Sequence, residues 1–173
     1  DGAWYRPHGA TPTTHILKLP VGLIHNASGS IDLTSSCDNE WTCLEIIRNF
    51  GIPTAAAWVE NFEDQRILVV ERFDRRWTSS RDWLLRLPQE DFCQALNLPS
   101  SKKYQTDYGP SMADCLDVLQ NSSNSYEDKL NFIKLQILFL LLSAPDGHAK
   151  NFSLHLHAGD NFSLTPTYDV LST

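Results

Sequence analysis

The segment that most constrains the fold is residues 126–142, because apolar side chains fill its second half almost completely. Its length and spacing predict a long helix, and Ser125 followed by Asp128 resembles a capping box at its start. The longest uninterrupted apolar run, residues 137–142, is far shorter than the roughly 20 residues that span a bilayer. We therefore expect no membrane association, and a helix buried on every side within a folded core.

The net charge and the cysteine content limit which binding partners and which cellular compartment we expect for the chain. The formal net charge of −7 repels nucleic-acid phosphates, so we expect DNA contact only through a bound protein. The chain holds four cysteines at irregular distances: Cys37, Cys43, Cys93 and Cys115. This pattern fits reduced intracellular thiols, and His155 and His157 have no third metal ligand at suitable spacing. With no secretion signal at its start, the chain is expected to be soluble and cytoplasmic.

The first part of the chain shows the patterns of strands and one helix. Residues 14–19 alternate apolar and polar side chains, and residues 38–50 have helical spacing followed by stop signals. Residues 55–60 and 67–73 are β-branched or aromatic runs joined by a polar turn, which indicates a hairpin. A loop rich in serine and asparagine is expected between the first strand and the helix.

Helical patterns dominate from residue 88 onward. Helices are expected at residues 89–96, 111–119 and 126–142, with a polar loop at 100–110. Residues 151–157 and 161–165 alternate around a turn at 158–160, so they predict a closing β-hairpin. The predicted class is α+β: part of a strand-rich lobe over residues 1–77, then part of a mainly helical lobe over residues 78–173 that ends in a hairpin.

One set of polar residues matches the needs of phosphoryl transfer from ATP. That reaction uses a carboxylate near the acceptor hydroxyl, oxygen ligands for Mg²⁺ and a lysine on the phosphates. Asp146 and Asn151 have the spacing of a kinase catalytic loop, and the predicted hairpin would return Asp169 beside them. Lys18 in a strand and Glu40 in the next helix follow the order of the kinase lysine and its ion-pair glutamate.

Neighbouring positions complete this hypothesis. Glu71, Arg72 and Phe73 end the last strand that we expect before the helical part, where a kinase hinge binds adenine through its main chain. His148 and Lys150 lie inside the predicted catalytic loop and could reach phosphate or nucleotide. The assignment of Glu71, Arg72 and Phe73 to a hinge depends on their position in the sequence more than on their residue types.

Each motif also has a purely structural interpretation. The Asp-Gly pair at residues 146–147 is a common turn that could simply end the long helix. Lys18 could be a solvated strand lysine, Glu40 a first-turn acid favoured by the helix dipole, and Asp169 a turn former. Taken singly, these interpretations are the more frequent ones, so the kinase hypothesis depends on the whole set.

Five segments together resemble the HipA family of kinases. They are TPTTHILKLP at residues 11–20, VERFDR at 70–75, LPQED at 87–91, DGHAKNFS at 146–153 and PTYD at 166–169. The resemblance covers essentially the whole chain, and several long motifs in the same order are far more specific than any one of them. It implies a protein-kinase-like fold of the HipA type.

The resemblance also implies a function. HipA proteins are toxins of type II toxin-antitoxin systems, serine/threonine kinases that use ATP and Mg²⁺ to phosphorylate glutamyl-tRNA synthetase, causing growth arrest and persistence. Their usual partner is the DNA-binding antitoxin HipB. The family pattern places the proton acceptor on Asp146, nucleotide contacts on Lys18, Glu71, Arg72, Phe73, His148, Ala149, Lys150, Asn151, Tyr168 and Asp169, and the metal on Asn151 and Asp169.

Departures from the family leave two alternatives open. HipA proteins carry an earlier Gly-rich phosphate loop with an autophosphorylated serine, and they continue beyond the Tyr-Asp-x-x-Ser motif at residues 168–172. The chain is therefore expected to be a central fragment. One alternative is a catalytically inactive module that binds nucleotide or antitoxin, and the other is a phosphotransferase acting on a small molecule.

Overall fold

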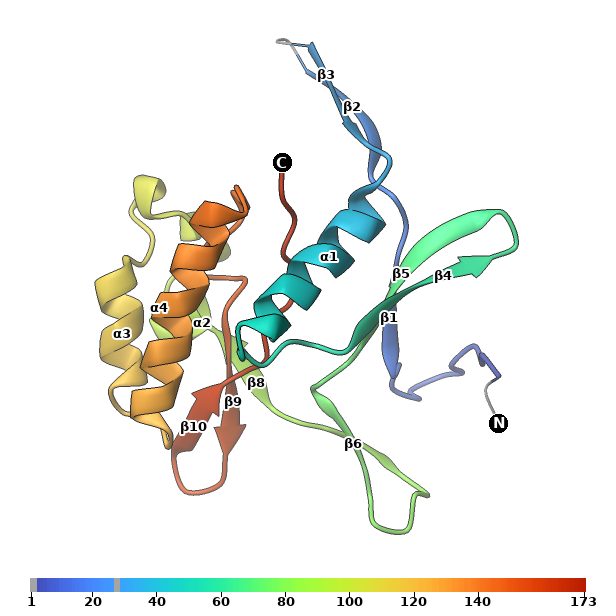
Figure 1. The fold of residues 1–173 in the computed structure, drawn as a ribbon. Helices are drawn as coiled ribbons and strands as arrows, with labels where there is room; N and C mark the ends of the chain where they lie inside the picture. The colour runs from blue at the N-terminus through green and yellow to red at the C-terminus, as the bar shows by residue number, and fades with distance from the viewer. Residues whose placement is uncertain (1–2, 27–28) are drawn as a thin grey trace.

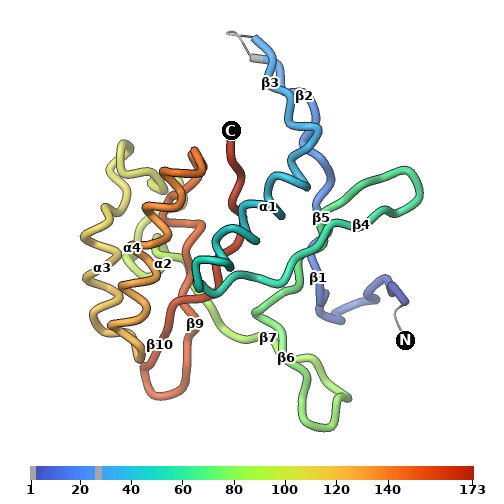
Figure 2. Tube along the Cα trace, in the orientation of Figure 1, coloured from blue at the N-terminus to red at the C-terminus, as the bar shows by residue number. Residues whose placement is uncertain are grey.

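The computed structural model describes residues 3–26 and 29–173, whose elements form two groups (Figure 1). The first group contains β1 (His15–Lys18), β2 (Gly22–Asn26), β3 (Gly29–Leu33), α1 (Ser36–Asn49), β4 (Ala57–Phe62), β5 (Gln65–Glu71), β6 (Arg75–Trp77) and β7 (Leu84–Arg86). The second contains β8 (Gln89–Asp91), α2 (Phe92–Ala95), α3 (Met112–Leu119), α4 (Ser125–Leu141), β9 (Ser153–His157) and β10 (Asn161–Leu164). The C-terminal segment runs beside α1 and between the groups (Figure 2), where Ser172 and Asn39 exchange two hydrogen bonds.

The first group is built on an antiparallel sheet in the order β1-β5-β4. β5 is paired on both edges, and α1 packs against the face that carries Leu68 and Val70, which form a small core with Cys37 and Ala55. Lys18 ends β1 directly opposite Leu68, so the sheet fixes the start of this side chain beside α1. The predicted strands and the predicted helix of this part are confirmed, with small shifts of their bounds.

Two hairpins were missed by the sequence analysis. The expected serine-rich and asparagine-rich loop contains β2 and β3, which pair from Gly22–Leu33 to Asn26–Gly29 and project away from the body (Figure 1). The prediction that the strand at 67–73 is the last one before the helices is wrong, since β6, β7 and β8 follow. The lobe boundary at residues 77/78 stays a prediction, and it falls between the paired strands β6 and β7.

The second group joins a small sheet to three helices. β9 lies between β8 and β10, so the predicted closing hairpin is confirmed and gains a third strand. The helix expected from residue 89 begins only at Phe92, because Gln89 pairs with His155 in the sheet. Asp91 caps the helix: its Oδ1 accepts from Gln94 N at 2.9 Å, and Gln94 Oε1 accepts from Asp91 N at 2.9 Å.

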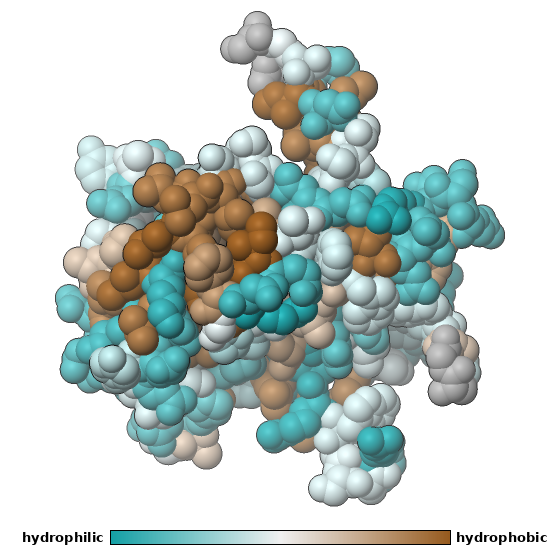
Figure 3. All heavy atoms as spheres, viewed as in Figure 1, coloured by the Kyte–Doolittle hydropathy of each residue, from teal (hydrophilic) through white to brown (hydrophobic). Residues whose placement is uncertain are grey.

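Two predictions for the long helix α4 are wrong. Ser125 does not form a capping box, because Asp128 instead accepts hydrogen bonds from the Ser122 hydroxyl and from Leu164 N. The second half of α4 is not buried on every side, since Leu140 and Leu141 are 80% and 71% exposed. They belong to a broad apolar surface over the end of the helix (Figure 3). In the described ranges, no helix is both long and apolar enough to cross a membrane.

The other face of α4 builds the main core. Phe132 and Phe139 on this face both contact the ring of Phe152, with centroids 5.2 and 5.6 Å apart. Phe152 is 4% exposed and directly follows Asn151, so core packing fixes one end of the segment between α4 and β9. The core thereby positions a candidate functional loop.

We expect Phe152→Ala to lower the free energy of unfolding by about 3–5 kcal/mol, since it leaves a cavity between two aromatic rings. Urea denaturation monitored by circular dichroism measures this. The matched control is Phe50→Ala, because Phe50 is 61% exposed and its removal should change stability by less than about 0.5 kcal/mol. Equal effects at both positions would contradict the packing described above.

Candidate active site

Lys18 joins three elements that are distant in the sequence. Its Nζ lies 2.7 and 2.9 Å from the two carboxylate oxygens of Glu40 on α1, and 2.6 Å from Asp169 Oδ1. Glu40 is buried, whereas Asp169 is about half exposed. The predicted pairing of Lys18 with Glu40 is thus present, and Asp169 shares the same ammonium.

The electrostatics of this cluster follow from burial and charge. Burial works to lower the pKa of the Lys18 ammonium, but the carboxylates of Glu40 and Asp169 outweigh it and raise that pKa above its usual value. Burial also raises the pKa of the Glu40 carboxyl, and the charge of Lys18 offsets only part of that effect. Lys18 therefore stays charged at neutral pH and is held at the edge of the site.

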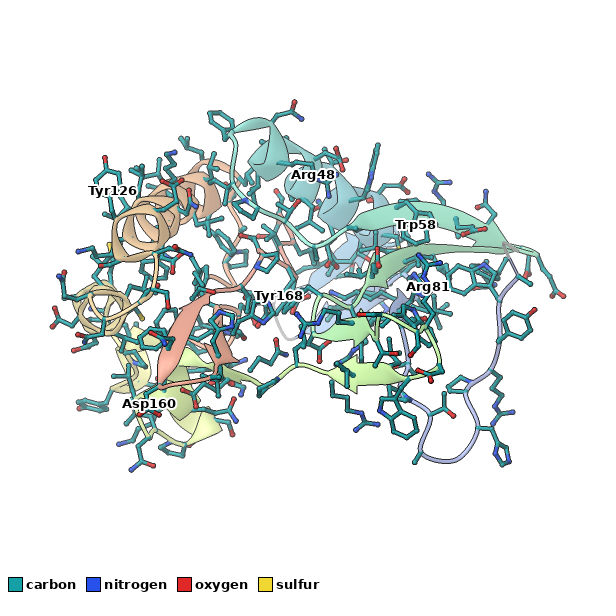
Figure 4. All side chains as sticks on the ribbon, turned by 90° about the horizontal axis from the view of Figure 1, so that it is seen from below. Arg48, Trp58, Arg81, Tyr126, Asp160 and Tyr168 are labelled. Atoms are coloured by element: carbon teal, nitrogen blue, oxygen red, sulfur yellow. The ribbon has the colours of Figure 1, made fainter. Side chains whose placement is uncertain are left out.

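The segment after β10 returns to the start of β9, as the sequence predicts. The Tyr168 hydroxyl lies 2.6 Å from Ser153 Oγ and donates to Lys150 O at 3.3 Å. Asp169 follows with φ +58°, a left-handed conformation that asparagine and aspartate adopt more readily than most residues. Tyr168 lies near the centre of the molecule, where the two groups of elements meet (Figure 4). This turn aims Asp169 at Lys18.

The loop between α4 and β9 is closed by bonds to the main-chain oxygen of Asp146. It accepts from His148 N at 2.8 Å and from Asn151 Nδ2 at 2.9 Å, and Asn151 N donates to His148 O at 2.9 Å. The Asp146 side chain is exposed. The sequence interval from Asp146 to Asn151 thus corresponds to one compact turn with the carboxylate on its outside.

His148 lies at the centre of this turn and is 9% exposed. Burial lowers the pKa of its imidazole, and nearby Asp146 and Asp169 both act to raise it. Both carboxylates are therefore within electrostatic reach of one ring. Among the described residues, no group forms a hydrogen bond with its buried Nδ1.

A cleft of about 250 Å³ opens beside Lys18. Of the predicted site residues, it is lined by Lys18, Glu71, Arg72, Phe73, Tyr168 and Asp169, together with Glu40. The ring of Tyr168 packs against Phe73 with centroids 5.5 Å apart, which connects the predicted hinge to the turn that carries Asp169. A larger hollow of about 1430 Å³ along residues 3–15 contains none of the predicted site residues.

Two predicted nucleotide contacts have other partners in the structure. Lys150 Nζ donates to Asp91 Oδ2 at 2.6 Å, so its ammonium is paired with the cap of α2. Ala149 is buried, and its N–H and C=O bond to Lys103 O and Phe92 N at 3.2 and 3.1 Å. Both residues support the shape of the loop, and their contact with nucleotide stays a prediction.

The carboxylate that anchors the predicted hinge was not predicted from the sequence. Asp74 accepts from Arg72 Nε at 3.0 Å and from Arg72 Nη2 at 2.8 Å, and it also pairs with Arg75. Burial alone would raise the pKa of the Asp74 carboxyl, but the two guanidinium groups hold it below its usual value. In the sequence, Asp74 directly follows the predicted hinge and lies between Arg72 and Arg75. This pattern could have identified it as an ion-paired acid.

The oxygen atoms of Asn151 and Asp169 suit the hard cation Mg²⁺. Because Asn151 Nδ2 donates to Asp146 O, its Oδ1 is the side-chain atom left for a cation, and Asp169 has Oδ2 beyond its bond to Lys18. Within residues 3–26 and 29–173, no cluster of three or more His, Cys, Asp or Glu side chains could hold a metal. Two protein ligands suit Mg²⁺ bound to ATP, because Mg²⁺ usually keeps several waters and takes phosphate oxygens as ligands.

We expect Asp74→Asn to lower the free energy of unfolding by about 2 kcal/mol at neutral pH, because it weakens charged hydrogen bonds to two arginines. The folded pKa of Asp74 is below its usual 3.8, so the contribution is present above pH 3.8 and is lost as pH falls through the lower value. Urea denaturation as a function of pH measures it. Asp64→Asn, at an exposed carboxylate in the turn between β4 and β5, is the control. A loss of stability in Asp74→Asn that persists unchanged in acid would refute the role of Asp74.

Solved structures share this architecture. The HipA chain of the Shewanella oneidensis MR-1 HipA, HipB and operator DNA complex superposes with a TM-score of 0.75 at 22% identity, over 98% of this chain and 45% of that one. The Helicobacter pylori proinflammatory kinase CtkA superposes with a TM-score of 0.62 at 15% identity, over 90% and 50%. At such identities the likeness shows the fold, so the predicted α+β, HipA-type, protein-kinase-like class is confirmed.

Two curated proteins are similar in sequence. "Putative kinase Y4mE" of Sinorhizobium fredii (strain NBRC 101917 / NGR234) is 32% identical over 174 residues, which is 100% of this chain and 39% of Y4mE. "Serine/threonine-protein kinase toxin HipA" of Shewanella oneidensis is 29% identical over 146 residues, which is 78% of this chain and 33% of that protein. The chain thus spans between a third and two fifths of the length of these relatives.

The family assignment depends on the match to a family profile. The sequence profile of the family described as HipA-like C-terminal domain matches residues 3–173, which include the cleft, the Lys18 cluster and the loop from Asp146 to Asn151. The chain therefore belongs to the HipA-like C-terminal domain family.

Proposed function

We propose that this chain carries the catalytic centre of a serine/threonine kinase that uses ATP and Mg²⁺. The observation that carries the proposal is the position of Lys18 Nζ between Glu40 and Asp169, at the edge of the cleft that the hinge lines. Kinases place a lysine, its glutamate and a metal-binding aspartate in this relation. The kinase names of the curated relatives support the same reaction.

The roles of the binding residues follow from their positions. Lys18 contacts the phosphates, while Asn151 Oδ1 and Asp169 hold Mg²⁺, which reduces the charge on the phosphate oxygens when ATP is bound. In the hinge, the N–H groups of Glu71 and Arg72 already donate to Ala56 O and Thr14 O at 2.8 and 2.9 Å. We therefore assign adenine recognition to the main chain of Phe73.

The reaction itself requires a group that accepts a proton from the attacking hydroxyl. Asp146 has an exposed carboxylate on a turn whose main chain is fixed by two hydrogen bonds. We assign it the role of proton acceptor for the acceptor serine or threonine. Tyr168 lines the cleft and His148 lies in the turn that carries Asp146. Both are assigned to nucleotide contact.

The proposal extends to the cellular role of the longer protein. We infer a toxin of a type II toxin-antitoxin system that acts in the cytoplasm, phosphorylates glutamyl-tRNA synthetase and causes growth arrest and persistence. Support comes from the similar Shewanella oneidensis proteins, a serine/threonine-protein kinase toxin HipA and a complex of HipA, HipB and operator DNA. A HipB-type antitoxin would then be the partner, and DNA would be reached only through it.

We expect Asp169→Asn to weaken Mg²⁺-dependent ATP binding by at least about tenfold, or roughly 1.4 kcal/mol, because it removes a charged metal ligand. Isothermal titration calorimetry with and without Mg²⁺ measures this. Asp160→Asn is a matched control, since Asp160 at the hairpin tip has φ +57°, close to the +58° of Asp169, and is exposed. Unchanged ATP affinity in Asp169→Asn would contradict the assigned metal site.

We expect Asp146→Asn to reduce kcat for phosphoryl transfer to glutamyl-tRNA synthetase by about 100- to 10,000-fold, the usual contribution of a general base. Transfer of labelled phosphate from ATP measures this, with calorimetry showing that ATP still binds. Transfer that survives the substitution would overturn the role of Asp146. ATP binding without transfer to any protein would favour a nucleotide-binding module, and transfer to an aminoglycoside alone would favour a small-molecule phosphotransferase.

A further inference from the structure

The polar loop at residues 100–109 has a defined structure around Tyr104. Its short 3₁₀ turns, Ser100–Lys102 and Gln105–Asp107, flank that residue on both sides. The main-chain oxygen of Tyr104 accepts from Asp107 N at 3.0 Å and from Gly109 N at 2.9 Å. The loop therefore closes on Tyr104 and fixes its backbone.

Gly109 is required for this closure. A Cβ atom at this position would lie 2.4 Å from Lys102 O and 2.5 Å from Tyr104 O, which is closer than atoms of this kind approach one another. Because both contacts are with main chain, the loop would have to move to accept any side chain. A change at Gly109 would therefore displace Tyr104 without altering its side chain.

The loop is also attached to the turn that carries Asp146. Ala149 N donates to Lys103 O at 3.2 Å, and the Tyr104 ring meets His148 edge to face with centroids 4.9 Å apart. Lys103 Nζ lies over the face of the same ring, 4.9 Å from its centroid. From this fixed ring the Tyr104 hydroxyl donates to Asp146 Oδ1 at 2.9 Å.

We propose that Tyr104 is a positioning residue for the transfer reaction, holding the Asp146 carboxylate in one orientation so that its second oxygen faces the acceptor hydroxyl. This inference rests on the proposed function, because it deepens the role assigned to Asp146. An exposed aspartate has several side-chain rotamers, and a hydrogen bond from a fixed phenol selects one of them. Preorganisation of this kind acts on kcat rather than on nucleotide affinity.

The phenol is suited to act as a lasting donor. The hydrogen bond to Asp146 raises the pKa of Tyr104 above its usual value, and the charge of Asp107 acts in the same direction. Lys103 and the buried ring of His148 are the other titratable groups around it. The proton therefore stays on Tyr104 at neutral pH, and the Asp146 carboxylate stays free to take one from the acceptor.

The first test compares Tyr104→Phe with wild type in transfer of labelled phosphate from ATP to glutamyl-tRNA synthetase. We expect kcat to fall about tenfold or more, the value of one charged hydrogen bond, with KM for ATP unchanged. Tyr108→Phe is the matched control. Tyr108 lies four residues after Tyr104 and is 88% exposed, and the substitution removes the same hydroxyl oxygen. A Tyr104→Phe enzyme with wild-type kcat would overturn the proposal.

Gly109→Ala provides a second variant that reaches Tyr104 through the loop. We expect it to lower kcat in the wild-type background and to add little in the Tyr104→Phe background, because both changes remove the same hydrogen bond. Thermal unfolding of each variant shows whether the fold is kept. Independent, multiplicative losses would mean that the loop acts by some route other than Tyr104, against the proposal.

Failure of this inference and failure of the proposed function give different results. Transfer that survives Asp146→Asn refutes the proposed function, whereas transfer lost in Asp146→Asn but normal in Tyr104→Phe refutes only the role of Tyr104. If wild type transfers nothing, tyrosinate absorbance still tests the contact: the titration of Tyr104, isolated by subtracting the Tyr104→Phe curve, should move to lower pH in Asp146→Asn. An unmoved titration would show that the two side chains do not interact.

Discussion

The ammonium of Lys18 is the group on which the rest of the site depends. Glu40 is 6% exposed and its carboxylate is compensated by that ammonium, so loss of Lys18 would leave a buried charge unpaired. The same ammonium holds Asp169, which lies 151 positions further along the chain. One cation thus connects β1, α1 and the turn after β10, and the cleft between the two groups of elements takes its shape from that connection.

Elements and contacts were predictable where the local sequence pattern and the local chemistry agree. Alternation of apolar and polar residues identified β1 and the closing hairpin, and a run of β-branched residues identified β5. The interval from Asp146 to Asn151 identified a turn whose hydrogen bonds lie within a few residues. Lys18 and Glu40 were paired from their order alone, and the structure brings them together.

Three of the failures involve partners that are distant in the sequence. Gln89–Asp91 form a strand because they pair with β9, which lies more than sixty positions later in the chain. Asp128 accepts hydrogen bonds from Ser122 and from Leu164 N and does not take part in a capping box with Ser125. Tyr104 lies in a segment whose composition indicates only a polar loop, and its hydroxyl finds Asp146 at a sequence separation of 42. Such contacts depend on the assembled fold, which no short window of sequence contains.

The separation of Lys18 from Asp169 also bears on protein synthesis. A ribosome must add 151 residues after Lys18 before Asp169 exists, which takes roughly 8 to 30 seconds at the usual elongation rate. The sheet of the first group and α1 can form once β5 has been made, at residue 71, but the cluster still lacks its second carboxylate. A nascent chain therefore cannot pair the ammonium of Lys18 with both carboxylates until Asp169 has been added.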